Sequence, residues 1–125
     1  MCLMVKRNWF RDLFKITPKL KVARKDIVVY KYLSQDLHGL ISPIYFQRWR
    51  SGECYTSTPI VIKRMKRIGY LVETGFHSYT KPRPFHLGSH LGKLYNAIIP
   101  KGSRYIIGEE DCIVSDRLII TGKYE

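Results

Sequence analysis

The sequence has few cysteines, no long apolar run and few acidic residues, and each shortage excludes a class of protein. Its three cysteines, Cys2, Cys54 and Cys112, are odd in number and widely spaced, so they indicate neither a disulfide framework nor a cysteine zinc site. No apolar run approaches the roughly 20 residues that span a bilayer, and the opening Met1–Arg7 has no long apolar stretch after its charges. We therefore expect reduced thiols, no membrane segment, no signal peptide and a cytoplasmic location.

The shortage of acids leaves a strongly basic chain. Ten Asp and Glu stand against 22 Lys and Arg, which gives a formal net charge of +12 and a pI of about 9.8. The cations gather in two segments: residues 1–25 hold eight with one acid, and residues 58–105 hold nine with one acid. Clustered cations at this pI favour a polyanionic partner such as a nucleotide or a nucleic acid, and a solvated basic surface is the alternative.

The length and composition predict one domain, residues 1–125, with a real hydrophobic core. A short amphipathic helix is predicted at residues 8–15, because apolar residues recur there every four positions before Pro18 stops the pattern. Residues 1–25 are thus expected to form a basic helix and arm that pack on or flank a β-rich core, residues 26–122. The expected fold class is α+β, with a mixed or antiparallel sheet.

Runs of β-branched and aromatic residues predict the strands of that core. The clearest runs are 26–33, 93–99, 104–107 and 116–122. The stretch 76–92 holds two prolines, two glycines and three histidines, and it predicts a long structured loop of the kind that often carries function.

Three kinds of side chain are candidates for binding an anionic ligand. Lys and Arg attract phosphates, hydroxyls hydrogen-bond phosphate or ribose, and aromatic or histidine rings beside cations contact a base or a sugar. Each pattern also has a purely structural explanation. The runs of charge can form a solvated surface, and the run of Ser and Thr can form a turn. The candidates are Lys63, Arg64, Lys81, Arg83, Lys101 and Arg104 as cations, Thr56 and Ser57 as hydroxyls, and Trp49, His77 and Tyr79 as rings.

Signatures of catalysis and of cofactors are weak. His86 and His90 are four apart and could share a metal, but the region offers three ligands where a closed zinc site takes four. The stretch Gly88–Lys93 has one residue too few between its glycines for a phosphate-binding P-loop, and Leu94 stands where that loop has Ser or Thr. We therefore expect no metal, no cofactor, and a binding protein rather than an enzyme.

Several short motifs together resemble a family of small uncharacterised proteins from phages and mobile elements of Bacteroides-type bacteria. The motifs are Met1–Arg7, Asp26–Leu33, Tyr55–Thr58, Gly75–Tyr79 and Ile98–Ile120. This resemblance implies a viral protein that acts in the cytoplasm of a bacterial host. Some small phage proteins counter host defence by sequestering cyclic nucleotide signals, as a sponge does.

A second set of residues is similar to ADP-ribosyltransferase-like folds. Tyr30, Thr56–Thr58, Pro100–Ser103 and Glu109–Glu110 follow one another in the order found in that family. The likeness implies a degenerate NAD-binding pocket, because Tyr30-Lys31 stands where the family has Arg or His on its first strand.

These features give one main hypothesis and two alternatives. The main hypothesis is a small, non-enzymatic phage-type protein that binds an anionic nucleotide and sequesters a defence signal of the host. The alternatives are a DNA- or RNA-binding accessory protein and a degenerate ADP-ribosyltransferase-like protein that binds NAD. The composition also allows a homo-oligomer.

Overall fold

The structure of the protein, a computed structural model, describes residues 3–4, 18–42, 47–65, 69–82 and 92–124. Throughout these ranges the regular structure is β-strand and no helix occurs, so the expected α+β class is wrong and the described chain is all-β. The physical reason is that its apolar runs are rich in Val, Ile and Tyr, which pack well on a pleated surface. The helix predicted at residues 8–15 lies outside the described residues.

Thirteen strands are present in the described part of the chain. The four runs predicted as strands, 26–33, 93–99, 104–107 and 116–122, coincide with β3, β10, β11 and β13 to within a few residues. The loop predicted at 76–92 is wrong in its first part, because Phe76–Tyr79 forms β9 by pairing with β12, and residues 83–91 lie outside the described ones. In chain order the strands are β1 (Leu3–Met4), β2 (Lys21–Val22), β3 (Ile27–Asp36), β4 (Gly39–Ile41), β5 (Arg48–Trp49), β6 (Cys54–Thr56), β7 (Ile62–Met65), β8 (Gly69–Val72), β9 (Phe76–Tyr79), β10 (Lys93–Ile99), β11 (Arg104–Ile107), β12 (Cys112–Ser115) and β13 (Arg117–Lys123).

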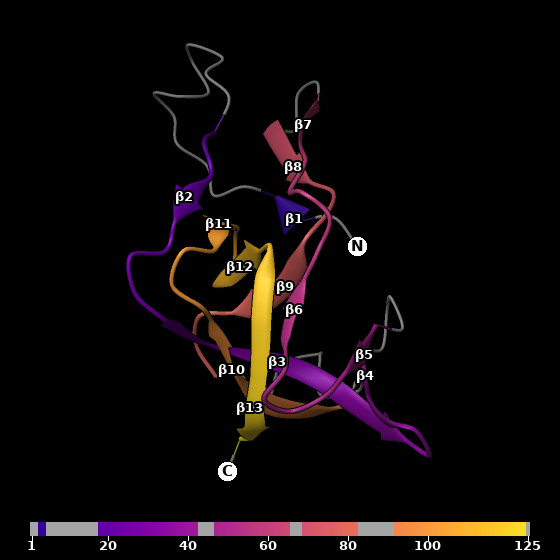
Figure 1. The fold of residues 1–125 in the computed structure, drawn as a ribbon. Coiled ribbons are helices and arrows are strands. Elements are labelled where there is room, and N and C mark those ends of the chain that lie inside the picture. Colours follow the sequence, from indigo (N-terminus) through magenta and orange to yellow (C-terminus); the bar gives the residue numbers. More distant parts are fainter. Residues whose placement is uncertain (1–2, 5–17, 43–46, 66–68, 83–91, 125) are drawn as a thin grey trace.

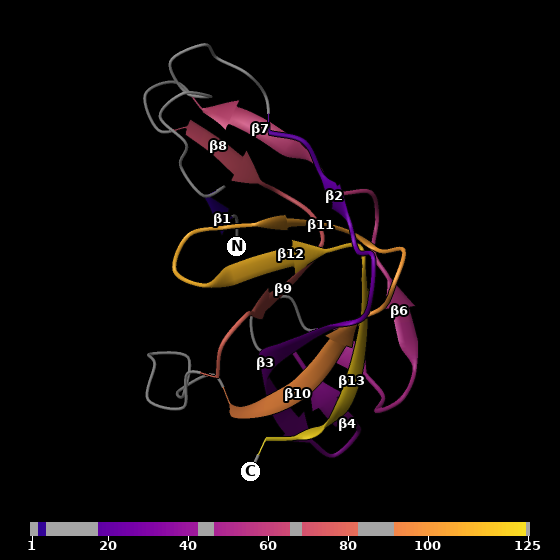
Figure 2. The same cartoon turned by 90° about the vertical axis from the view of Figure 1, so that its left-hand side faces the viewer.

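Ten of these strands form one strongly curved antiparallel sheet (Figures 1 and 2). Its order is β2-β11-β12-β9-β3-β10-β13-β6, with β4 paired to β3 and β5 paired to β4. Only Asp116 separates β12 from β13, yet β12 pairs with β9 and β13 pairs with β10. The path from β12 through β9, β3 and β10 therefore returns to the same stretch of chain, and the sheet wraps around an interior.

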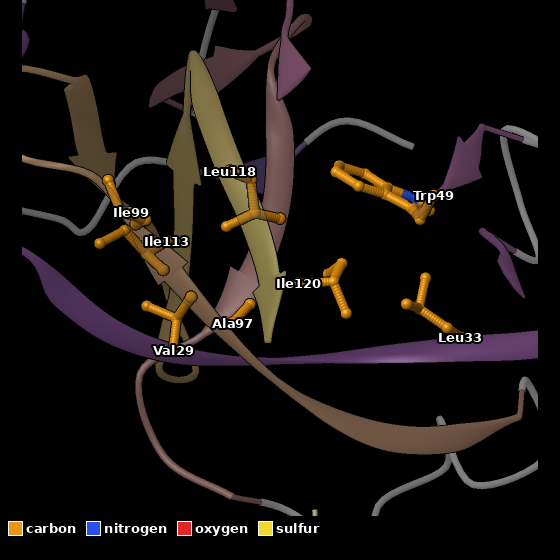
Figure 3. Close-up of a cluster of buried hydrophobic side chains, with 8 residues drawn as sticks. All are labelled: Val29, Leu33, Trp49, Ala97, Ile99, Ile113, Leu118 and Ile120. Atoms are coloured by element: carbon orange, nitrogen blue, oxygen red, sulfur yellow. The ribbon is translucent and has the colours of Figure 1, made fainter. Parts of the chain in front are cut away.

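Apolar side chains from five strands fill this interior (Figure 3). Trp49 is the largest of them, and its ring meets the rings of Tyr55 and Phe76 edge-on, with centroids 5.0 and 4.9 Å apart. Burial of large aromatic and aliphatic side chains is the main term that stabilises a domain of this size. The buried members are Val29, Leu33, Trp49, Ala97, Ile99, Ile113, Leu118 and Ile120.

A second, smaller core joins the curved sheet to an antiparallel three-stranded sheet, β1-β8-β7 (Figure 2). β12 lies between the two cores, because Ile113 belongs to the first and Val114 to the second. All four residues of β12 are buried. A strand covered on both faces reads as a continuous apolar run rather than as an alternation. The second core consists of Ile60, Tyr70, Val72, Ile106 and Val114.

Candidate functional site

The aromatic ring of Trp49 is part of the core and is not available to stack on a base. The residue is 3% exposed, and its indole Nε1 donates a 2.7 Å hydrogen bond to Ser42 Oγ. Because its faces are covered by Tyr55 and Phe76, an incoming base would have to displace core side chains. The prediction that Trp49 lies beside a loop and contacts a ligand is therefore not supported, because its side chain on β5 points into the core.

His77 and Tyr79 lie on β9, where both are half-buried. The Tyr79 ring meets Tyr32 edge-on at 5.9 Å between centroids. Burial, and then the nearby charge of Lys31, lower the pKa of His77 from 6.5 to about 4. The imidazole is therefore neutral at pH 7 and contributes no charge toward a phosphate.

The depressed pKa of His77 predicts a specific loss of stability in acid. An unfolded histidine takes up its proton near pH 6.5, whereas the folded one takes it up only near pH 4, so stability is lost as the pH falls through this window. After a discount for its partial exposure, we expect His77→Gln to remove about 2 kcal/mol of the acid-induced loss. Urea unfolding of both proteins at pH 7, 6, 5 and 4 measures this; parallel curves would contradict it.

The remaining predicted cations fall in different places. Lys63 and Arg64 lie on β7 in the three-stranded sheet, and Lys63 Nζ is 3.8 Å from Glu73 Oε1. Lys81 follows β9 next to the acidic turn 108–111, since Thr80 N donates to the Asp111 carbonyl at 2.8 Å. Arg83 lies outside the described residues. Lys63, Arg64 and Lys81 thus lie on or beside other elements than Lys101 and Arg104.

Lys101 and Arg104, by contrast, lie where three segments of the chain meet. They flank the turn between β10 and β11, and β11 pairs with β2 through Arg104↔Val22 and Tyr105↔Lys21. The hydrogen bonds Ala23 N to Ser103 O and Gly102 N to Ala23 O, both 2.8 Å, continue this pairing along the turn. The pairing brings the basic stretch 21–25 alongside Lys101 and Arg104.

Two aspartates fix the backbone of this turn. Asp26 Oδ1 accepts the Lys101 N–H at 2.8 Å, and Asp116 Oδ1 accepts the Arg104 N–H at 2.9 Å. Asp116 N also donates to the Arg104 carbonyl at 3.0 Å, so the bend between β12 and β13 is tied to the start of β11. These carboxylates hold backbone amides, and the cationic side chains beside them point into water.

The predicted hydroxyls lie against the same bend. Thr56 pairs with Arg117 across β6 and β13, and Ser57 N donates to the Asp116 carbonyl at 2.8 Å. The Thr56 side chain is exposed, whereas Ser57 Oγ donates to the Thr58 carbonyl. The exposed Thr56 side chain can therefore contact a ligand. The Ser57 hydroxyl instead stabilises a local turn, as the alternative prediction for the Ser and Thr run has it.

We call the resulting surface the basic turn cluster. Five of its six cations are exposed and the sixth, Arg117, is half-buried with Nη2 3.5 Å from the Lys101 carbonyl. Within the described ranges none of the six forms an ion pair with a carboxylate. Four of them were not among the sequence candidates. The charge of residues 1–25 was the signal that could have found three of these, Lys21, Arg24 and Lys25, but not Arg117. The cluster consists of Lys21, Arg24, Lys25, Lys101, Arg104 and Arg117.

Comparisons with protein families, with curated proteins and with solved structures find no match. The phage-family and ADP-ribosyltransferase-like resemblances therefore stay predictions. Among the described residues, no helix has the length and apolarity to cross a membrane, and no three His, Cys, Asp or Glu gather as metal ligands would. The basic turn cluster is the candidate site that the geometry offers.

Proposed function

We propose that the protein binds a nucleic acid non-covalently, through phosphate contacts at the basic turn cluster. One observation carries the proposal: backbone pairing brings three segments that carry six cations to the β10–β11 turn and its flanks, with no ion pair to a carboxylate in the described part of the chain. Unpaired, exposed Lys and Arg at one place are the electrostatic footprint of a polyanion binder.

The exposure of the cluster favours a polymer over a single nucleotide. A small-nucleotide site needs convergent polar groups in a concave, largely apolar setting, whereas phosphates of a polymer are reached from an open edge. The rings predicted to stack on a base, Trp49 and Tyr79, are engaged with other rings of the protein. Exposed Thr56, beside Arg117, adds one hydrogen-bonding group for a phosphate or a sugar.

The decisive experiment compares ligand length and salt. Fluorescence anisotropy with labelled DNA of 10, 20 and 40 bp at 50, 100 and 200 mM salt gives the affinities, with ATP, NAD and a cyclic dinucleotide as competitors. We expect affinity to rise with length and to fall with salt, with a log–log slope of about −5 if all six cations contact phosphates. Saturation by one short nucleotide, with no gain from longer DNA, would replace this proposal with the small-ligand hypothesis.

A matched pair of double variants locates the binding surface. Lys101→Gln/Arg104→Gln removes two phosphate contacts, so we expect weaker binding at every DNA sequence and a salt slope reduced by about two. Lys81→Gln/Lys93→Gln removes the same charge elsewhere. β10 separates Lys93 from Lys101 by roughly 20 Å at about 3.3 Å per residue. Equal effects of the two variants would show that charge alone, and not this cluster, drives binding.

A further inference from the structure

Lys31 carries its charge into the core of the curved sheet. It lies on β3 between Val29 and Leu33, and side chains two apart on a strand share a face, so Lys31 faces the same interior as these two buried residues. Its ammonium Nζ donates a 2.6 Å hydrogen bond to the His77 carbonyl and lies 5.7 Å from the centroid of the Trp49 ring.

The described residues use only part of the bonding capacity of this ammonium. A lysine ammonium has three donors, and within the described part of the chain Lys31 has one acceptor, the His77 carbonyl. No carboxylate pairs with it in the described ranges. Loss of water around the amine lowers its pKa from 10.5 to about 8, which still leaves it mainly protonated at pH 7. Holding a cation away from water without a nearby anion lowers the stability of the fold. Groups of this kind are found more often at binding sites than elsewhere.

Ser78 provides a second unused polar group on the same face. The residue is 3% exposed, and its Oγ has no hydrogen-bond partner among the residues that the structure describes. Ser78 is two positions from Phe76, which packs on the interior core, so both side chains point inward. The antiparallel pair Tyr30↔Tyr79, extended by one residue on each strand, places Lys31 opposite Ser78.

We propose that Lys31 and Ser78 form a binding site for a small organic carboxylate. Two donors facing each other across neighbouring strands match the two oxygens of a carboxylate, and one ammonium matches its single charge. Trp49 lies 5.7 Å from the ammonium and packs against Phe76, so these rings limit the ligand to a small carboxylate such as acetate. Lys31 as a whole is half-buried, although its ammonium is withdrawn from water. The basic turn cluster has no part in this site.

Acetate is the probe for this site. The 13Cε resonance of Lys31, assigned by its loss in Lys31→Met, is followed while sodium acetate replaces sodium chloride at constant ionic strength and pH 7. We expect a saturable shift of this resonance, no saturable shift for exposed Lys93, and a melting temperature about 3–5 °C higher at ten times the Kd. A linear, unsaturable response, or an equal response to chloride, would overturn the proposal.

Ser78→Ala is the sharper variant because it removes an unpartnered hydroxyl and leaves the fold intact. We expect it to weaken acetate binding at least fivefold while its binding of DNA stays at the wild-type level. Lys31→Met should abolish the thermal response to acetate, and Lys93→Met should retain it. Unchanged acetate affinity in Ser78→Ala would contradict the site, whatever the outcome of the DNA experiments.

Discussion

Gly92→Ala is expected to destabilise the protein by about 3–5 kcal/mol, since it combines backbone strain with overpacking. Gly92 has φ +128°, a conformation that side-chain-bearing residues rarely adopt. A Cβ at this position would lie 2.3 Å from the Leu33 carbonyl oxygen and 2.6 Å from its carbon. These atoms belong to the backbone of β3, and every residue of β10 pairs with this strand. They therefore cannot move without disturbing the sheet.

Two other glycines distinguish the effect of backbone strain from that of overpacking. Gly39 has φ +114°, but a Cβ added there would meet no described atom within 4 Å, so Gly39→Ala tests strain alone and should cost about 1–2 kcal/mol. Gly122 on β13 has no positive φ, and a Cβ added there would likewise meet no described atom within 4 Å, so Gly122→Ala should be neutral or stabilising by about 0.5 kcal/mol. Urea unfolding of the three variants gives the free energies. A cost for Gly92→Ala no larger than that for Gly39→Ala would show that the clash relaxes.

The strands that the sequence predicts are those that obey the usual patterns. β3, β10 and β13 are long and rich in Val, Ile and Tyr, which is the signal that propensity detects. β12 was missed, because burial between two cores removes the alternation that marks a half-exposed strand. The sequence predicts a loop where β9 lies, because Phe76–Tyr79 forms a strand through its pairing with β12, which is a tertiary contact.

The candidate site was predictable only in part, for a related reason. Which cations meet depends on strand pairing, and the β2–β11 register that joins residues 21–25 to Lys101 and Arg104 leaves no local mark in the sequence. Which face a residue takes depends on register as well. Tyr32 is buried on one face of its strand, and Lys31 beside it faces the core built around Trp49 on the other.

Lys31→Met is expected to stabilise the protein at pH 7 and to lose most of that advantage by pH 10. The folded pKa of Lys31 is about 8 against an ordinary value of 10.5, so the unfolded chain binds more protons between these values. Wild-type stability attributable to this group therefore rises as the pH increases from 8 to 10.5, and the cost of the buried charge is fully present below pH 8. The shift corresponds to about 3 kcal/mol, and methionine fills a similar volume with no charge.

The difference between the two proteins isolates Lys31 from the other groups that titrate in alkali. Two described neighbours are retained in the variant: His77, whose carbonyl accepts the Lys31 hydrogen bond, and Tyr95, which pairs with Lys31 across β10. Lys93→Met, which removes one exposed lysine, should stay within about 0.5 kcal/mol of wild type throughout. Urea unfolding at pH 7, 8, 9 and 10 measures the three curves. A gap between wild type and Lys31→Met that does not change with pH would mean that the amine is solvated and that the core carries no charge, which would also remove the basis for a carboxylate site.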